Sequence, residues 1–236
     1  MSLPKIVTQD EWLVARKRLL AREKELTRAQ DALNADRRRL PMVLIEKEYT
    51  FDGPRGRVTL AGLFEGRRQL IVKHFMFGPT WDAGCEGCTS AADEVSDGLM
   101  EHLSARDTTF AFVARAPLAR LEAYRGRRGW AFPLYSSYTS DFNYDFQVSF
   151  DPSSGRVEYN YRPGPFGVED EGQGLSCFLR DGDRVFHTYS AFARGTECEN
   201  PSYGFLDLTA LGRQEDWEEP KGRVRSPHEA APVFTD

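Results

Sequence analysis

The chain has 236 residues, of which 40% are hydrophobic and 28% charged, and its net charge is −5. This composition predicts one substantial folded core, and it excludes a disordered chain and the basic footprint of a nucleic-acid-binding protein. No run of about 18 apolar residues occurs, which excludes a membrane-spanning helix. Residues 1–10 lack the basic and apolar regions of a signal peptide, so we expect a cytoplasmic location.

A long helix is predicted at the N-terminus. Thr8 and Glu11 have the spacing of a capping box, which begins the helix at Gln9, and Pro41 ends it. A large apolar side chain recurs every seven residues, at Trp12, Leu19, Leu26, Leu33 and Leu40. Such a seam packs either on the chain's own domain or on a second copy. Residues 1–41 are therefore interpreted as a helical extension, and we hypothesise a homodimer through it.

The next region predicts alternating strands and helices. A hairpin is expected on either side of Asp52-Gly53-Pro54, followed by a buried strand that begins at Gln69. Val95, Leu99 and Leu103 recur at helical spacing, which predicts one helix starting at or just before Cys88. A second apolar strand covers residues 108–114, and Pro117 stands at the first turn of another helix. This alternation predicts a right-handed parallel β-α-β unit with helices on the sheet faces.

The pair Cys85 and Cys88 lies between the first of these strands and its helix. A helix N-terminus favours an anion, so it lowers the pKa of a thiol there, whereas the neighbouring Glu86 raises it. The sign of the net shift stays open at this stage. A second thiol three residues along can resolve a mixed disulfide formed at the first. The Cys-x-x-Cys spacing also serves metal sites, and redox use is our preferred interpretation.

The second half of the chain predicts an insertion, a hairpin and a tail. Residues 138–172 are rich in aromatic, polar and turn-forming residues, which indicates an insertion into the domain. Asp181-Gly182 separates two alternating strands over residues 175–179 and 184–189, and this is the clearest hairpin signal in the chain. We therefore expect one domain from 42 to 211, and residues 212–236 form a charged, proline-containing tail.

These elements resemble the thioredoxin fold: α/β, with a central mixed sheet flanked by helices, here extended by the long N-terminal helix. More closely, several short segments of the sequence resemble the bacterial thioredoxin-like family DUF899, whose members are labelled predicted dithiol-disulfide oxidoreductases. These segments are Phe75-Met76-Phe77-Gly78-Pro79, Trp81, Gly84-Cys85-Glu86-Gly87-Cys88, Val113-Ala114-Arg115-Ala116-Pro117-Leu118, and Gly129-Trp130 with Tyr135-Ser136-Ser137.

The thioredoxin resemblance implies a role for four residues. Cys85 would be the attacking thiolate and Cys88 the resolving thiol, while Trp81 and Pro133 would shape the substrate groove. Pro133 matches the cis-proline that thioredoxins place opposite the dithiol, and an ordinary trans proline at a strand start is the alternative. The implied substrate is a disulfide-containing protein or a small thiol, and no cofactor, nucleic acid or membrane is involved.

The sequence departs from two known patterns. Gly84, not tryptophan, precedes the first cysteine, and Glu86-Gly87 stands where thioredoxin has Gly-Pro. The peroxiredoxin pattern Pro-x-x-x-Thr-x-x-Cys is not met either, because Gly78 and Asp82 occupy its Pro and Thr positions. These departures argue against general thioredoxin activity and against a classical peroxidase site.

A binding module without catalysis is the alternative to an oxidoreductase. In that interpretation Cys85 and Cys88, joined by His74, hold a thiophilic metal, or the aromatic residues between 130 and 150 line a pocket for a small ligand. Cys177 is expected to be a small buried apolar residue, and Cys198 a loop thiol of low reactivity.

Overall fold

The computed structural model describes residues 3–151, 153, 158–163 and 170–228, and these form two compact units. One unit comprises the described residues up to Pro41 and from Leu206 onward, and the other comprises Met42–Phe205. Within the described residues, no helix is both long and apolar enough to cross a membrane. The predicted domain limits, 1–41, 42–211 and 212–236, stay a prediction.

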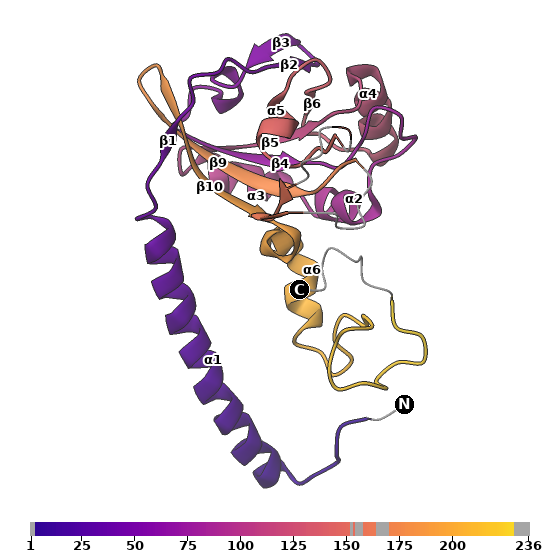
Figure 1. The fold of residues 1–236 in the computed structure, drawn as a ribbon. Helices are drawn as coiled ribbons and strands as arrows, with labels where there is room; N and C mark the ends of the chain where they lie inside the picture. Colours follow the sequence, from indigo (N-terminus) through magenta and orange to yellow (C-terminus); the bar gives the residue numbers. More distant parts are fainter. Residues whose placement is uncertain (1–2, 152, 154–157, 164–169, 229–236) are drawn as a thin grey trace. The chain divides into compact units, whose positions relative to one another are not determined.

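The first unit contains the long helix α1 (Gln9–Arg37), which begins where the sequence predicts. Thr8 caps it: the backbone N–H of Glu11 donates to Thr8 Oγ1 at 3.3 Å, and the backbone N–H of Thr8 donates to Glu11 Oε2 at 2.9 Å. The helix is continuous (Figure 1), and its apolar seam is exposed, with Leu26 69% accessible. A homodimer through this seam stays a prediction.

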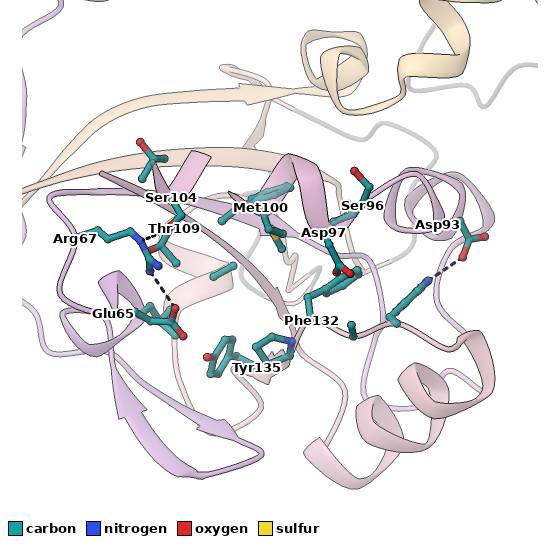
Figure 2. Close-up of a pocket in the computed structure, with 18 of the residues that line it drawn as sticks. Glu65, Arg67, Asp93, Ser96, Asp97, Met100, Ser104, Thr109, Phe132 and Tyr135 are labelled. Carbon is teal, nitrogen blue, oxygen red and sulfur yellow. Dashed lines mark hydrogen bonds and ion pairs between the residues drawn. The ribbon is translucent and has the colours of Figure 1, made fainter. Parts of the chain in front are cut away.

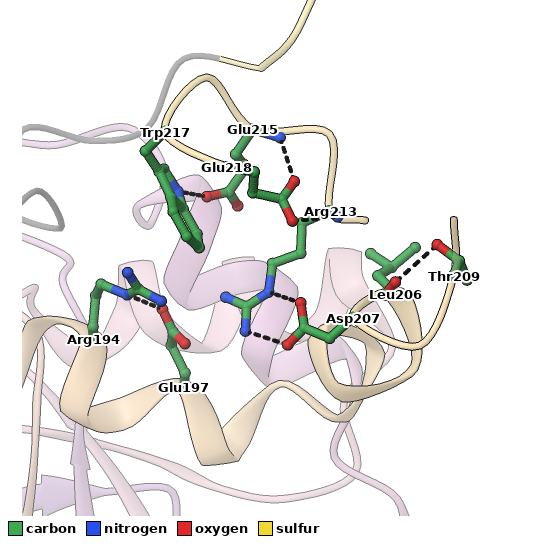
Figure 3. Close-up of polar contacts among 9 residues, drawn as sticks. All are labelled: Arg194, Glu197, Leu206, Asp207, Thr209, Arg213, Glu215, Trp217 and Glu218. Atoms are coloured by element: carbon green, nitrogen blue, oxygen red, sulfur yellow. Dashed lines mark hydrogen bonds and ion pairs between the residues drawn. The ribbon is translucent and has the colours of Figure 1, made fainter. Parts of the chain in front are cut away.

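The C-terminal part of this unit is held by local polar contacts (Figure 3). Arg213 donates two hydrogen bonds to the carboxylate of Asp207, both 2.8 Å long. The carboxylate of Glu218 accepts from the backbone N–H groups of Arg213 and Glu215, each at 3.0 Å. The described part of the predicted tail therefore has its own folded structure.

The second unit contains a mixed sheet of eight strands, in the order β1-β10-β9-β4-β5-β6-β2-β3. The strands are β1 (Val43–Leu44), β2 (Thr50–Gly53), β3 (Gly56–Thr59), β4 (Gln69–His74), β5 (Thr108–Ala114), β6 (Leu134–Ser136), β9 (Gly174–Asp181) and β10 (Arg184–Phe192). A separate pair is formed by β7 (Glu158–Tyr159) and β8 (Arg162–Pro163). The helices are α2 (Glu86–Asp93), α3 (Asp97–Ser104), α4 (Leu118–Arg128), α5 (Phe142–Asp145) and α6 (Pro201–Leu206), with 3-10 helices η1 (Gly62–Phe64) and η3 (Ala193–Glu199).

The sheet has the predicted thioredoxin-like arrangement (Figure 1). Strand β4 pairs in parallel with β5 and antiparallel with β9, and β9 pairs antiparallel with β10. Helices α2 and α3 connect β4 to β5, and α4 connects β5 to β6, which is also parallel. The predicted fold class is confirmed. The dithiol follows β4, the strand at the centre of this arrangement.

Two hydrophobic cores lie on the two faces of the sheet. One face packs against η1 and α5 and includes Leu70, Val72 and Phe142. The other packs against α2 and α4 and includes Phe75, Cys88 and Leu121. Because side chains alternate along a strand, residues of even number on β4 face the first core and residues of odd number face the second.

The helix after the dithiol differs from the prediction of a single helix, because the chain forms two. Helix α2 ends at Asp93, and Ser96 begins α3 by accepting a hydrogen bond from the backbone N–H of Leu99 at 3.2 Å. A serine at this position competes with a continuing helix, since its hydroxyl binds the free backbone donors of a new first turn. The apolar periodicity continued across this break and concealed it.

The predicted hairpins are confirmed. Strands β2 and β3 pair from Thr50–Thr59 to Gly53–Gly56, and β9 and β10 pair around the turn at Gly182. Gly182 has a φ of +61°, which a glycine adopts without strain. In the predicted insertion, residues 138–172, the described residues include α5, β7 and β8, and residues 152, 154–157 and 164–169 lie outside the described residues.

Candidate dithiol site

Cys85 is the residue that begins helix α2. Its backbone N–H donates to Met76 O at 2.9 Å, which ties the loop before the helix back to the end of β4. Its carbonyl accepts from the backbone N–H of Thr89 at 2.9 Å and from the Thr89 hydroxyl at 2.8 Å. The sequence prediction that this cysteine stands at a helix N-terminus is therefore correct. All four cysteines of the chain are free thiols.

The two thiols of the pair differ strongly in acidity. The pKa of Cys85 is lowered to about 6, chiefly because the Cys88 thiol donates a hydrogen bond to its sulfur. Burial opposes this shift, while the backbone N–H groups of Cys88 and Gly87 and the charge of Lys73 assist it. The pKa of the buried Cys88 is raised well above its usual range, since its proton is held by Cys85 and burial disfavours its thiolate. The shift at Cys85 is thus downward, in spite of Glu86.

A buried polar cluster lies beside Cys88. Lys73, on β4, is fully buried, and its Nζ bonds Gln173 Oε1 at 3.3 Å and forms an ion pair with Glu199. The Cys88 thiol lies 3.7 Å from the same oxygen of Gln173. Burial raises the pKa of Glu199, and the charge of Lys73 partly offsets this. A buried charge is costly unless paired, so Glu199 and Gln173 explain how Lys73 is accommodated beside the dithiol.

Sequence reasoning missed Lys73, Gln173 and Glu199. One signal was present, because Lys73 carries a full charge within the apolar run that leads to the dithiol. Its partners come from the far end of the chain, 100 and 126 residues later, so only the folded sheet brings them together.

A second buried carboxylate lies near this cluster. Glu171, two residues before Gln173, accepts from Arg115 Nη1 at 3.0 Å and from Ser149 Oγ at 2.7 Å. Burial is the largest influence on this carboxyl and raises its pKa to about 7, against the effects of Ser149 and Arg115. Arg115 follows β5 directly and also lies over the ring of Tyr144, 4.5 Å from its centroid. Charged groups therefore gather near the edge of the sheet at which β4 and β5 end.

Trp81 belongs to the surroundings of the dithiol. It is half-buried and packs, with Cys85, against the hydrophobic core on the α2 side of the sheet. Its carbonyl accepts from Arg120 Nη1 at 2.8 Å, and its indole covers Gly78 so closely that a Cβ there would lie 2.8 Å from Nε1. Gly78 is thus required by the tryptophan's position.

Of the two alternatives for Pro133, the ordinary trans proline holds and the cis-proline does not. Its part in shaping a substrate groove stays a prediction. Among the described residues the single cis peptide is Glu219–Pro220, and Pro133 lines a cavity with Asp93, at the end of α2 remote from Cys85. The prediction chose the first strand after the second helix, which is β6. The strand that pairs antiparallel with β4 is β9, and Gln173, immediately before β9, is the residue that faces the dithiol.

The alternative metal site is also not formed. His74 faces the opposite side of the sheet from Cys88: it stacks on Phe142, with ring centroids 5.5 Å apart, and its Nε2 lies 2.8 Å from Ser176 Oγ. Burial lowers the pKa of His74 to about 3. The described part of the chain contains no group of three or more histidine, cysteine or acidic residues that could hold a metal ion.

The two remaining cysteines lie outside the dithiol pair. Cys177, on β9, is half-buried, so it is less enclosed than the small buried apolar residue that the sequence predicts, and burial raises its pKa to about 11. Cys198 is exposed on η3.

Comparison with protein families identifies the chain. A model described as "Bacterial protein of unknown function (DUF899)" matches residues 1–229. The chain belongs to the DUF899 family. The predicted family is therefore confirmed over nearly the whole sequence. No curated protein matches this DUF899 chain significantly.

Solved structures similar to this DUF899 protein share little of its sequence. Peroxiredoxin Q of Xanthomonas campestris is 14% identical, with a TM-score of 0.49, covering 72% of this chain and 98% of its own. Peroxidoxin BcpB of Mycobacterium tuberculosis is 13% identical, with a TM-score of 0.47, covering 69% and 92%. A putative protein disulfide isomerase of Bacteroides thetaiotaomicron is 15% identical, with a TM-score of 0.37, covering 69% and 87%. At these values the activities of those proteins are not carried over to this chain.

Proposed function

We propose that this DUF899 protein is a thiol-disulfide oxidoreductase in which Cys85 attacks and Cys88 resolves. The observation that supports this best is the unequal acidity of the pair. At neutral pH a thiol with a pKa of about 6 is mostly thiolate, whereas its buried neighbour keeps its proton. One thiol is thereby prepared as a nucleophile and the other is held in reserve.

The proposed reaction consists of two exchanges. The Cys85 thiolate attacks one sulfur of a substrate disulfide, the S–S bond breaks, and the released substrate thiolate takes up a proton. Cys88 then loses its proton and attacks the sulfur of Cys85 in the mixed disulfide, which releases the second substrate thiol. The substrate gains two electrons and the protein ends with a Cys85–Cys88 disulfide, which a thiol reductant must reduce for another turnover.

The groups around the pair support these steps. The charge of the buried Lys73 favours the thiolate at both sulfurs, so it assists the attack by Cys85 and the later deprotonation of Cys88. Trp81 forms part of the surface near Cys85 and is our candidate for substrate contact. We infer a disulfide-containing protein or a small disulfide as substrate, in a reducing compartment such as the cytoplasm.

A redox titration tests this function. The protein is equilibrated in glutathione buffers of increasing oxidised fraction, and free thiols are counted by mass-tagging. The expected result is a reversible two-electron transition in the wild type that is absent in Cys85→Ser. A pair of thiols that stays reduced at every poise would contradict the proposal.

Trapping tests the assignment of the two roles. Cys88→Ser cannot resolve the first exchange, so it should accumulate mixed disulfides through Cys85, whereas Cys85→Ser should form none there. Cys177→Ala serves as the matched control, because its thiol lies outside the pair. Equal exchange activity of Cys85→Ser and the wild type would refute the role of Cys85.

A further inference from the structure

Among the described residues, the first half of strand β5 has a paired strand on one side only. On that side β4 pairs with β5 from Thr108 to Val113, which is all of β5 except its last residue. Strand β6 pairs with only the last three residues, from Phe112 to Ala114, because it begins late in the register. The segment Thr108–Ala111 therefore forms an edge inside an otherwise continuous sheet.

The backbone groups on this open side can be assigned from the register. In a parallel strand successive residues direct their N–H and C=O groups to alternate sides. The carbonyl of Val113 accepts from Phe75 on the β4 side, and that of Ala114 accepts from Ser137 on the β6 side. Thr108 and Phe110 are an even number of residues from Ala114, so their backbone N–H and C=O groups point to the same side as those of Ala114. On that side β6 does not extend far enough to pair with them.

A cavity of about 620 Å³ occupies the missing position (Figure 2). Its lining includes all four residues of the open edge. It also includes Leu63 and Tyr135 from the core on one face of the sheet and Trp130 and Phe132 from the core on the other. Because these two cores lie on opposite faces of the sheet, a cavity lined by both lies in the plane of the sheet, beside the open edge of β5. Its volume falls within the range of about 300–1,000 Å³ that is typical of binding sites.

The cavity lining is part apolar and part polar. Phe110, Phe132 and Met100 contribute apolar surface, while the charged side chains come mainly as ion pairs. Arg67 bonds Glu65 at 3.2 Å, and Arg128 pairs with Asp93. Asp97, in the first turn of α3, is the exception, since its carboxylate has no hydrogen-bond or ion-pair partner among the described residues. The lining therefore has one carboxylate in excess of its arginines.

We propose that this cavity binds an extended polypeptide segment, which adds to the sheet as a short strand beside Thr108–Ala111. The N–H and C=O groups of Thr108 and Phe110 have no backbone partner within the part of the chain that the structure describes. In this proposal they supply the main-chain hydrogen bonds, as in other cases of strand addition to an open edge. Four residues of added strand span about 13 Å. The apolar part of the lining accepts uncharged side chains, and the Asp97 carboxylate favours a basic residue over an acidic one.

This proposal goes beyond the proposed redox function, because neither Cys85 nor Cys88 lines the cavity. It is tested on the full-length Cys85→Ser variant, so that disulfide exchange does not contribute. The probe is an acetylated, amidated hexapeptide of alternating valine and lysine. We expect binding, seen as changes at the backbone amides of Thr108 and Phe110 in a nuclear magnetic resonance titration and as slower hydrogen exchange at both.

Two modified probes test strand addition directly. An added strand directs only every second N–H group toward β5, so N-methylation of that set should weaken binding at least tenfold, and N-methylation of the other set should not. Equal effects of the two methylated peptides, changes located away from β5, or no binding at millimolar peptide would each overturn the proposal.

The charge preference is tested with Asp97→Asn. This variant should bind the valine-lysine peptide severalfold more weakly and should reduce its advantage over a valine-glutamate peptide. Asp183→Asn, which removes an exposed carboxylate from the turn between β9 and β10, is the control and should change neither affinity. Equal affinity of the wild type for the two peptides would refute the role of Asp97.

Discussion

The chemistry of Cys85 depends on a single proton of its neighbour. The hydrogen bond from the Cys88 thiol is the largest influence on the Cys85 pKa, ahead of burial and the backbone donors of α2. The helix N-terminus, which first suggested a reactive thiol in the sequence, therefore contributes less than the second cysteine does. The nucleophile and the resolving thiol form one acid-base unit.

Removing the Cys88 thiol should make Cys85 less acidic. In the wild type, the thiolate of Cys85 should form with a midpoint near pH 6. In Cys88→Ala we expect this midpoint to rise by about one unit or more, because the donor that stabilises the thiolate is gone. Ultraviolet absorbance of the thiolate, followed against pH, measures both midpoints.

The control for this titration is Cys177→Ala. The Cys177 thiol has a pKa of about 11, so it does not ionise in the pH range around 6 in which the Cys85 thiolate forms. An unchanged midpoint in Cys88→Ala would show that the backbone of α2 or the charge of Lys73 governs the acidity instead.

The ion pair between Lys73 and Glu199 should behave as a coupled unit in stability. Both side chains are buried, with 0% and 8% accessible, so removing one leaves the other charge without its partner. Lys73→Met should therefore destabilise the protein by about 3–5 kcal/mol, whereas Lys73→Met with Glu199→Leu should cost less than the single change. Urea denaturation of the wild type, both single variants and the double variant gives these free energies of unfolding. Additive costs would contradict the coupling.

At the scale of elements, the sequence was sufficient where a local signal and the tertiary structure agree. The capping box at Thr8, the apolar strand at residues 108–114 and the Asp-Gly turn at Gly182 each formed as predicted. Each depends on hydrogen bonds or periodicity within a few residues, which the sequence displays directly. Cys85 could be placed for the same reason, since a strand, a turn and a helix follow one another around it.

The sequence was insufficient where the position of a strand in the sheet decided the outcome. Pro133 precedes β6, which is the strand that follows β5 along the chain. Gln173 precedes β9, which is the strand that lies antiparallel beside β4 in the sheet. Strand order is a property of the whole sheet and leaves no mark at Pro133 itself. The break at Ser96 was missed for a different reason, because apolar periodicity continued across it and outweighed a single capping residue.

At the scale of the whole molecule, the sheet gathers buried ionisable groups next to the dithiol. Lys73 comes from β4, Glu171 from the chain just before β9, and Glu199 from η3. Each is costly to bury alone, and each is buried with hydrogen-bond or ion-pair partners. A protein with several such groups should have a free energy of unfolding that varies with pH. The direction of this variation is clearest for Glu171.

Burial raises the pKa of Glu171 from its reference value of 4.5 to about 7 in the folded state. The folded protein thus holds this proton more tightly than the unfolded chain does. The resulting stabilisation is fully present below about pH 4.5 and is lost as the pH rises through 7. Glu171→Gln keeps the shape and removes the titration, so the wild type should lose stability relative to this variant as the pH rises through this range, by an amount on the order of 3 kcal/mol.

Urea unfolding of both proteins from acidic to neutral pH measures this difference. Glu101→Gln is the matched control, since Glu101 is an exposed glutamate on α3 and its replacement should leave the pH dependence of the wild type unchanged. If Arg115, which bonds Glu171 at 3.0 Å, held the carboxyl ionised instead, the difference would run in the opposite direction. The sign of the change in stability with pH therefore decides whether burial or the ion pair with Arg115 controls the charge of Glu171. Glu171 lies two residues before Gln173, which faces the dithiol.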